Sequence, residues 1–197
     1  MIHALSVTFR EAAPAELDVL VRIDDDAATL YEEAGLDFSG PAIRAFVDAE
    51  QARWRRAAEA HRVELAVDAQ GEAVGFVALG FVDGQPYVDQ LSVVRRAMRR
   101  GVGRALLARA LAWSERAGAL WLTTYAHLPW NAPMYERAGF TRVEESGCGP
   151  ELRAILREER AALPSPEQRL AMVRRPRVSG GRASPSPPGA PPRPSRT

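Results

Sequence analysis

The most constraining feature of the sequence is a change of pattern after residue 94. Residues 63–94 contain three β-type runs joined by turns at 70–72 and 83–84, a pattern typical of consecutive antiparallel strands. The chain then passes through a loop with two glycines and an amphipathic helix that ends at Gly118, before a further strand at 119–125. A strand, a helix and a strand in this order form a right-handed parallel crossover. The sequence therefore predicts a mixed sheet.

Further elements are expected on both sides of this segment, because apolar residues recur there at helical or strand spacing. The remaining strands are expected at residues 5–9, 140–144 and 170–174. Helices are expected at residues 14–33, 41–60, 131–139 and 150–163. The fold class is therefore α/β, with a mixed central sheet of about six to seven strands and helices on both faces.

Residues 1–177 are expected to form one domain, since a chain of 197 residues is long enough to bury a core without a metal or a disulfide. From Val178 onward the sequence VSGGRASPSPPGAPPRPSRT is rich in Pro, Gly, Ser and Arg and has almost no aliphatic side chains. Such a segment cannot offset the entropy of ordering, so residues 178–197 are expected to be disordered.

The charge of the chain is divided unevenly. All 26 basic residues are arginines, and six of them lie between Arg174 and Thr197, where there is no acidic residue. This end therefore carries +6 and the rest of the chain −5, although the formal net charge of the whole chain is only +1. Recognition of nucleic acid requires a basic surface, so no specific nucleic-acid partner is expected.

Cysteine usage and hydropathy indicate where the protein acts. Cys148 is the only cysteine, so an intrachain disulfide is excluded and a reducing cytoplasm fits. The first residues lack the basic and apolar parts of a signal peptide, and no run approaches the roughly 18 apolar residues of a membrane span. No cluster of Cys and His residues predicts a metal site. We therefore expect a cytoplasmic protein with neither a membrane nor a metal partner.

The loop MRRGVGRALL, from Met98 to Leu107, has the composition of an anion-binding site. A loop that leads from a strand into a helix presents free backbone N–H groups and the positive end of the helix dipole. Gly101 and Gly103 let an anion approach the backbone, and the neighbouring arginines add positive charge. A tight turn with solvated arginines is the other interpretation of these residues.

Two common nucleotide-binding loops do not fit this spacing. A dinucleotide fingerprint requires a third glycine where Leu106 stands and an acidic residue about 20 positions on, where Trp121 stands. A Walker loop requires a lysine, and the chain has none.

The loop and a second motif together resemble one family. LSVVRRAMRRGVGRALL, residues 91–107, resembles the acyl-CoA-binding motif of the GNAT superfamily of N-acetyltransferases, in which Gln/Arg-x-x-Gly-x-Gly/Ala follows a strand. MYERAGF, residues 134–140, resembles the closing motif of that family. The order of the expected elements is also similar, and the resemblance covers about residues 7–174. It implies the GNAT acyl-CoA N-acyltransferase fold, with acetyl-CoA as co-substrate.

The resemblance also implies a set of cofactor-binding residues. The pantetheine arm of CoA would pair with backbone groups of Leu91, Ser92 and Val93. The pyrophosphate would be held by the N–H groups of Arg99, Arg100, Gly101, Val102, Gly103 and Arg104.

Two positions depart from the family pattern. Met98 replaces the Gln or Arg that opens the glycine motif, and Leu128 stands where many members have an asparagine. Asn131 is the nearest alternative for that CoA contact, although the same residue is suited to cap the short helix that follows it.

Tyr135 matches the tyrosine that protonates the leaving CoA thiolate in many GNAT enzymes. A phenol with a pKa of about 10 stays protonated at neutral pH, so it is a suitable acid for this step. The alternative is an aromatic ring that only packs, one turn before Gly139.

The base is less determined. An ammonium with a pKa of about 9 to 10 must lose a proton before its nitrogen can attack an acyl group. Asp89 is one candidate, because alternation along its strand predicts that it shares a face with Tyr87, Leu91 and Val93. His127 is the other, since it follows a strand and an ordinary histidine has a pKa of about 6.5.

The acceptor is expected to be a primary amine of a small molecule or peptide. The acidic residues at 24–26 and 32–33 would attract a cationic amine, or they form a solvated helix face. The main hypothesis is an acetyl-CoA-dependent N-acetyltransferase that works by direct transfer. The alternatives are a non-catalytic acyl-CoA-binding regulatory module of the same fold and a protein that contacts nucleic acid through its arginine-rich end. A homodimer is left open.

Overall fold

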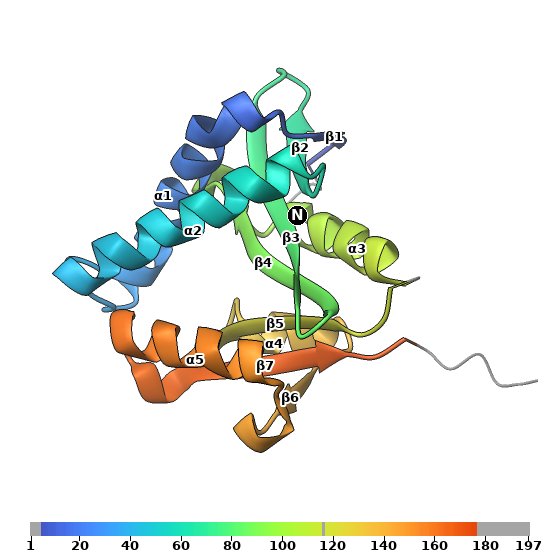
Figure 1. Ribbon diagram of the computed structural model, residues 1–197. Coiled ribbons are helices and arrows are strands. Elements are labelled where there is room, and N and C mark those ends of the chain that lie inside the picture. The colour runs from blue at the N-terminus through green and yellow to red at the C-terminus, as the bar shows by residue number, and fades with distance from the viewer. Residues whose placement is uncertain (1–4, 116, 177–197) are drawn as a thin grey trace, which may run out of the picture.

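Seven strands form one mixed sheet (Figure 1). The computed structural model describes residues 5–115 and 117–176. The strands are β1 (Val7–Glu11), β2 (Val63–Asp68), β3 (Ala73–Val82), β4 (Gln85–Val93), β5 (Leu120–Tyr125), β6 (Thr141–Val143) and β7 (Arg169–Arg174). Their order is β1-β2-β3-β4-β5-β7-β6, with β4 and β5 parallel and the other neighbours antiparallel. The expected mixed sheet is confirmed, whereas the segment 178–197 lies outside the described residues.

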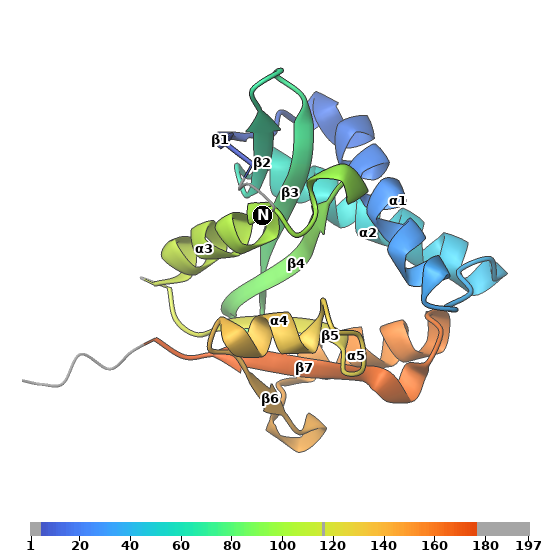
Figure 2. The same ribbon diagram turned by 180° about the vertical axis from the view of Figure 1, so that it is seen from behind.

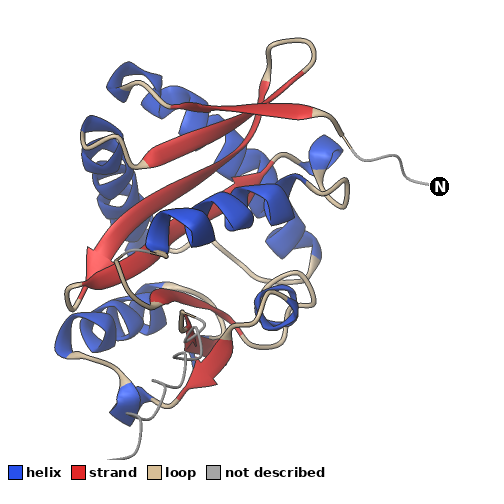
Figure 3. Cartoon of the chain, turned by 90° about the vertical axis from the view of Figure 1, so that its right-hand side faces the viewer, coloured by secondary structure: helices blue, strands red, loops and turns tan. Residues whose placement is uncertain are grey.

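Helices cover both faces of the sheet (Figure 3). In the described part of the chain they are α1 (Leu17–Glu33), α2 (Pro41–Glu59), α3 (Val102–Ser114), α4 (Ala132–Arg137) and α5 (Pro150–Ala162). On one face, α1 and α2 bury Leu20 and Trp54 against β2 and β3. The Trp54 ring meets the Phe76 ring edge-on, with centroids 5.3 Å apart.

The opposite face is covered by α3. Val102, Leu106 and Ala110 recur every four residues, so they lie on one side of the helix, and all three are buried against the sheet. Each buried leucine contributes roughly 1.5–3 kcal/mol of transfer free energy. On the same face as α2, α5 packs Leu152 and Leu156 against β4 and β7 (Figure 1).

A β-bulge in β4 changes which side chains face which helices. Ala78 of β3 pairs with Gln90 but Leu79 pairs with Val88, so Asp89 is an extra residue in β4. Asp89 and Gln90 therefore both point towards α1 and α2.

Leu91 and Val93 lie on the other side of β4, next to Gly103 of α3. The expectation that Asp89 shares their face is wrong, because strict alternation does not hold across a bulge.

The parallel pair β4–β5 diverges almost at once. Its ladder contains a single residue pair, Tyr87 with Trp121, and the strands then separate towards their carboxyl ends (Figure 2). Every other neighbouring pair has at least three paired residues. The sheet is therefore interrupted in its middle rather than at an edge.

The turn between β3 and β4 holds the start of α5. Asp83 has a left-handed backbone, with φ at +51°. Its carboxylate accepts the backbone N–H groups of Glu151 at 2.9 Å and Leu152 at 3.1 Å, while its own N–H donates to the Glu151 carboxylate. These contacts satisfy N–H groups that have no partner inside the helix.

Replacing Asp83 with alanine is expected to lower the free energy of unfolding by about 1–2 kcal/mol, because the helix loses its cap. Urea unfolding of the two proteins measures this difference. Asp83→Asn is the control, because asparagine keeps a carbonyl acceptor and tolerates a left-handed backbone. It should lose less than half of the stability that Asp83→Ala loses. Equal losses for both variants would show that the cap is not the cause.

No helix within residues 5–115 and 117–176 is both long and apolar enough to span a membrane. Within the same residues, His, Cys, Asp and Glu side chains form no group of three or more arranged to hold a metal ion.

Candidate functional site

The side of β4 that faces β5 presents unpaired main-chain groups. The N–H of Val94 donates to the carbonyl of Val74 at 2.9 Å, so the main-chain groups of residue 94 point towards β3. In an antiparallel pair the main-chain groups alternate, which directs Ser92 to β3 but Leu91 and Val93 away from it. No described strand pairs with β4 there, because β5 has already diverged. Leu91, Ser92 and Val93 were expected to pair with the pantetheine arm. Only Leu91 and Val93 have main-chain N–H and C=O groups that do not pair with β3.

The third of these residues serves the protein itself. The Ser92 hydroxyl donates to the carboxylate of Asp24 on α1 at 2.6 Å, and Gln90 donates to the same oxygen at 2.5 Å. Ser92 thereby holds α1 against β4.

The loop after β4 forms an anion-binding shape. Arg99 and Gly101 both have left-handed backbones, with φ at +59° and +91°. A left-handed residue beside a helix start turns successive N–H groups towards one point. The first bond inside α3 joins the Ala105 N–H to the Gly101 carbonyl at 3.0 Å, so the N–H groups of residues 102–104 have no helical partner.

The folded protein does not require glycine at position 103. A Cβ there would lie 3.6 Å from Val93 and 3.8 Å from Leu91, which is ordinary contact. Gly101 differs, because its positive φ disfavours any side chain. An absent side chain that packing does not explain fits a position approached closely by a ligand.

The arginines of this region divide into two groups. Arg95 pairs with Glu33 at 2.8 Å, and Arg96 pairs with Asp68 at 3.0 Å. Within the described residues, no carboxylate pairs with the three arginines nearest the helix start, which are Arg99, Arg100 and Arg104. Their charge is available to an anion. Met98 instead packs, half-buried, against the core below α3.

Tyr135 lies on α4, on the same side of the sheet as α3 and Leu91. Its ring is half-buried and meets Phe140 edge-on at 5.6 Å. Gly139, with φ at +88°, makes the turn that brings Phe140 back against the tyrosine. Burial raises the pKa of Tyr135 above its ordinary value of 10, and nearby Tyr31 raises it further. The hydroxyl is thus a proton donor throughout the neutral range.

Asn131 precedes α4 but its side chain does not cap the helix. Its Oδ1 accepts the hydroxyl of Tyr31 on α1 at 3.2 Å. Tyr31 is surrounded by the rings of Phe38, Tyr125 and Trp130, each with its centroid 6.0 Å away. This aromatic cluster closes the end of the molecule beyond β5.

The two candidate bases differ in their surroundings. His127 is exposed on the loop after β5, where its ring contacts Tyr125 edge-on at 5.7 Å. Asp89 is largely buried and accepts a hydrogen bond from Nε of Arg53 on α2 at 3.0 Å. Burial raises the pKa of Asp89, and the Arg53 guanidinium opposes that shift.

Two charged side chains beside Asp89 were not singled out from the sequence, and both lie on α2. Arg53 pairs with Asp89, and Glu50 lies 3.5 Å from Arg53. One signal was present: Glu50 is seven residues after Ile43 and four before Trp54, so it falls on the buried face of the helix. A carboxylate on such a face is uncommon without a partner or a function.

The acidic residues of α1 mostly hold the protein together. Asp24 is bound by Ser92 and Gln90, and Asp26 accepts the N–H of Arg95 at 2.5 Å. Glu33 pairs with the guanidinium of the same arginine. These contacts anchor α1 to β4 and to the loop that follows it.

A buried polar network joins the strands where β4 and β5 still meet. Arg169 of β7 pairs with Glu159 of α5 at 2.7 Å, with both side chains less than one tenth exposed. Thr123 donates to Glu159 at 2.5 Å and is hydrogen-bonded to the Tyr87 hydroxyl at 2.9 Å. The network fixes the point from which the two strands diverge.

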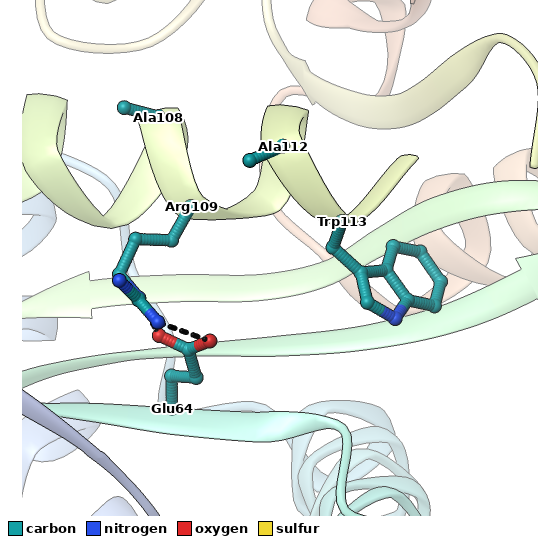
Figure 4. A pocket seen from close by; sticks show the side chains of 5 residues that line it. All are labelled: Glu64, Ala108, Arg109, Ala112 and Trp113. Atoms are coloured by element: carbon teal, nitrogen blue, oxygen red, sulfur yellow. Dashed lines mark hydrogen bonds and ion pairs between the residues drawn. The ribbon is translucent and has the colours of Figure 1, made fainter. Parts of the chain in front are cut away.

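A shallow groove on the outer side of α3 contains no residue of β4, the glycine loop or α4. It runs along α3 and is lined by Glu64, Ala108, Arg109, Ala112 and Trp113 (Figure 4). An ion pair between Arg109 and Glu64 crosses it. The candidate site is therefore the diverging pair of strands with the adjoining glycine loop.

A comparison with known proteins gives a family match that spans this region. The profile of the Acetyltransferase (GNAT) family matches residues 27–140, which include β4, the glycine loop, α3 and Tyr135.

Solved structures share the fold at low sequence identity. PaiA N-acetyltransferase from Thermoplasma acidophilum, solved with coenzyme A, is 15% identical with a TM-score of 0.60, over 87% of this chain and 99% of that one. The ribosomal-protein-S18-alanine N-acetyltransferase from Escherichia coli is 15% identical with a TM-score of 0.56, over 89% and 97%.

A third structure is a longer protein. N-acetylglutamate synthase from Neisseria gonorrhoeae, complexed with coenzyme A and N-acetyl-glutamate, is 17% identical with a TM-score of 0.59. The match covers 86% of this chain but only 35% of the synthase, so this chain spans about a third of its length.

Proposed function

Because the chain belongs to the GNAT acetyltransferase family, we propose that it transfers an acetyl group from acetyl-CoA directly to a primary amine of a small molecule or peptide. The observation that carries the proposal is the divergence of β4 and β5 beside the glycine loop. It leaves main-chain groups of Leu91 and Val93 beside an anion-binding helix start. A ligand that combines an amide-containing arm with a pyrophosphate matches this pairing.

Acetyl-CoA fits these residues in two parts. The pyrophosphate is bound by the N–H groups of residues 102–104 and by the arginines at 99, 100 and 104. The amides of the pantetheine arm extend the sheet by pairing with Leu91 and Val93. Ser92 is left out of this contact, because its main chain pairs with β3. The side-chain oxygen of Asn131 accepts the Tyr31 hydroxyl, so a contact of this side chain with CoA uses its Nδ2 amide group.

Tyr135 supplies the proton that the leaving thiolate needs. Its half-buried position beside the core of α3 and its raised pKa keep the hydroxyl protonated. The acetyl thioester supplies the acyl group, and the amine attacks its carbonyl carbon. We assign proton removal from the amine to a carboxylate on the opposite side of β4, where Asp89 lies, rather than to the exposed His127. The proposal places the reaction in the cytoplasm, because the lone cysteine, Cys148, fits a reducing compartment.

Saturating acetyl-CoA is expected to raise the melting temperature by about 5–10 °C, because a ligand at 100 times its Kd adds about 2.7 kcal/mol to the stability of the folded state. Differential scanning fluorimetry measures the shift. Adenosine lacks the pyrophosphate and should give none. No shift with acetyl-CoA up to millimolar concentration would contradict the binding part of the proposal.

Transfer itself is tested by CoA release. The protein is mixed with acetyl-CoA and with benzylamine, tryptamine, 1,4-diaminobutane, spermidine and an alanine-initiated peptide in turn, and free thiol is measured. At least one amine should release CoA faster than the control without amine, with an acetylated product detected by mass spectrometry. Binding without release for every amine would favour a non-catalytic protein.

A further inference from the structure

Four carboxylates converge on the α1 and α2 side of β4, each from a different element. They are Asp24 of α1, Glu50 of α2, Asp89 of β4 and Glu159 of α5. The positive groups among them are Arg53 of α2 and Arg169 of β7, and the exposed Arg56 of α2 acts on Asp89 from outside the buried region. Four negative groups thus face two positive ones in a largely buried region, which is costly unless protons or a cation compensate.

Three of these carboxylates are occupied by the protein. Asp24 accepts hydrogen bonds from Ser92 and Gln90. Asp89 accepts one from Arg53. Glu159 accepts hydrogen bonds from Thr123 and Arg169, which fix its orientation.

Glu50 is different. Its nearest positive group is Arg53, at 3.5 Å, and within the described residues it accepts no hydrogen bond. Its side chain is 18% exposed, against 10% for Asp89 and 7% for Glu159. It therefore combines a carboxylate that accepts no hydrogen bond within the described residues with the best access from solvent among these three.

We propose that Glu50 is the catalytic base, the group that takes the proton from the ammonium of the acceptor. The inference rests on the proposed function, because it assigns one step of that reaction. It replaces Asp89 in this role, since the Asp89 carboxylate is held by Arg53. Arg53 then acts as a positioning residue, which lies between Glu50 and Asp89 and opposes the rise that burial causes in the pKa of Asp89.

The ammonium gives one proton to the Glu50 carboxylate, and the neutral nitrogen attacks the carbonyl carbon of acetyl-CoA, forming the C–N bond. The C–S bond then breaks, and the thiolate takes the proton of the Tyr135 hydroxyl. The tyrosinate recovers a proton from the new amide nitrogen, and Glu50 releases its proton to water. The products are the acetamide, CoA thiol and one proton.

The surroundings of Glu50 give it the proton affinity of a base. Burial raises its pKa from the ordinary 4.5 to about 8, with a further contribution from Asp24. Asp89 and Glu159 act in the same direction, and Arg53 opposes them. A carboxylate that titrates near the working pH accepts a proton from an ammonium much more readily than an ordinary glutamate does.

The test is Glu50→Gln, assayed with the amine from the panel that the wild type acetylates fastest. At pH 7 we expect kcat/KM to fall about 50-fold, within the usual range for a general base. The wild-type rate should rise to a plateau above a pH of about 8, and this inflection should be absent in the variant. The deficit should narrow at pH 9.5, where free amine exists without help. Glu50→Asp should restore part of the rate.

Two controls separate catalysis from folding. Asp48→Asn changes an exposed carboxylate on the same helix and should leave the pH profile unchanged. Melting temperature supplies a readout without activity. The raised pKa means that the stability Glu50 contributes is present below pH 4.5 and is lost as the pH rises to about 8. Glu50→Gln should therefore melt higher than the wild type at pH 8, and no higher at pH 4.5.

The outcomes distinguish the inference from the proposed function. An active wild type with an unchanged rate and pH profile in Glu50→Gln would overturn only the role of Glu50. Loss confined to Asp89→Asn would assign the base to that residue instead. A wild type that binds acetyl-CoA but acetylates no amine would refute the proposed function, and the role of Glu50 with it.

Discussion

Replacing Tyr135 with phenylalanine is expected to lower kcat by about 100- to 1,000-fold, because the leaving thiolate loses its proton donor. The Kd for acetyl-CoA should change by less than about twofold, since the ring packing against Phe140 is kept. CoA release and ligand-induced melting shifts measure the two quantities. Because burial raises the pKa of Tyr135, the wild-type kcat should show no loss on the alkaline side up to a pH of about 10.

Tyr125→Phe is the matched control for this experiment. It removes a hydroxyl that donates to the Pro164 carbonyl at 2.9 Å, so it should cost about 1 kcal/mol of stability. Its kcat should stay within about twofold of the wild type. Equal losses of kcat in the two variants would mean that Tyr135 acts through packing rather than as an acid.

Changing Gly103 to aspartate is expected to weaken acetyl-CoA binding by at least about 100-fold, or about 2.7 kcal/mol. The carboxylate would stand at the helix start, where it occupies the N–H groups and repels the pyrophosphate. The same charge favours the fold, because Gly103 is the second residue of α3 and an acidic side chain there stabilises a helix by about 0.3–1 kcal/mol. The affinity for acetyl-CoA, measured by isothermal titration, should therefore fall, while the free energy of unfolding, measured in urea, should rise.

Ala108→Asp is the control for charge alone. Ala108 is exposed in the middle of α3, away from the loop, and its replacement should leave the Kd for acetyl-CoA within about twofold. If Gly103→Asp binds acetyl-CoA as tightly as the control does, the pyrophosphate does not lie at this helix start.

The sequence was sufficient for the order of the elements and for the anion-binding loop, because both depend on local patterns. Turn residues, helical spacing and the two glycines act within a few positions of one another. The face of Asp89 was predicted wrongly because that prediction also depended on a local pattern, the alternation of side chains along a strand. A single extra residue in β4 reverses alternation, and nothing in the letters around Asp89 marks the bulge.

Long-range charge pairing was beyond local patterns. Arg53 and Asp89 meet because α2 lies across β4, which the spacing of either element alone does not indicate. Glu50 was the detectable case, since it interrupts the buried face of its helix between Ile43 and Trp54. His127 illustrates the opposite error: a residue type suited to base chemistry lies exposed on a loop.

The divergence of β4 and β5 has a consequence for how the sheet meets other chains. Unpaired strand groups normally occur at sheet edges, where they invite pairing with a second molecule and lead to aggregation. Here such groups lie in the middle of the sheet, between α1 and α2 on one side and α3 and α4 on the other. The helices on both sides therefore distinguish this gap from an open sheet edge. Under the proposed function, the pantetheine arm of acetyl-CoA pairs with these groups, so the bound ligand also covers backbone that would otherwise favour aggregation.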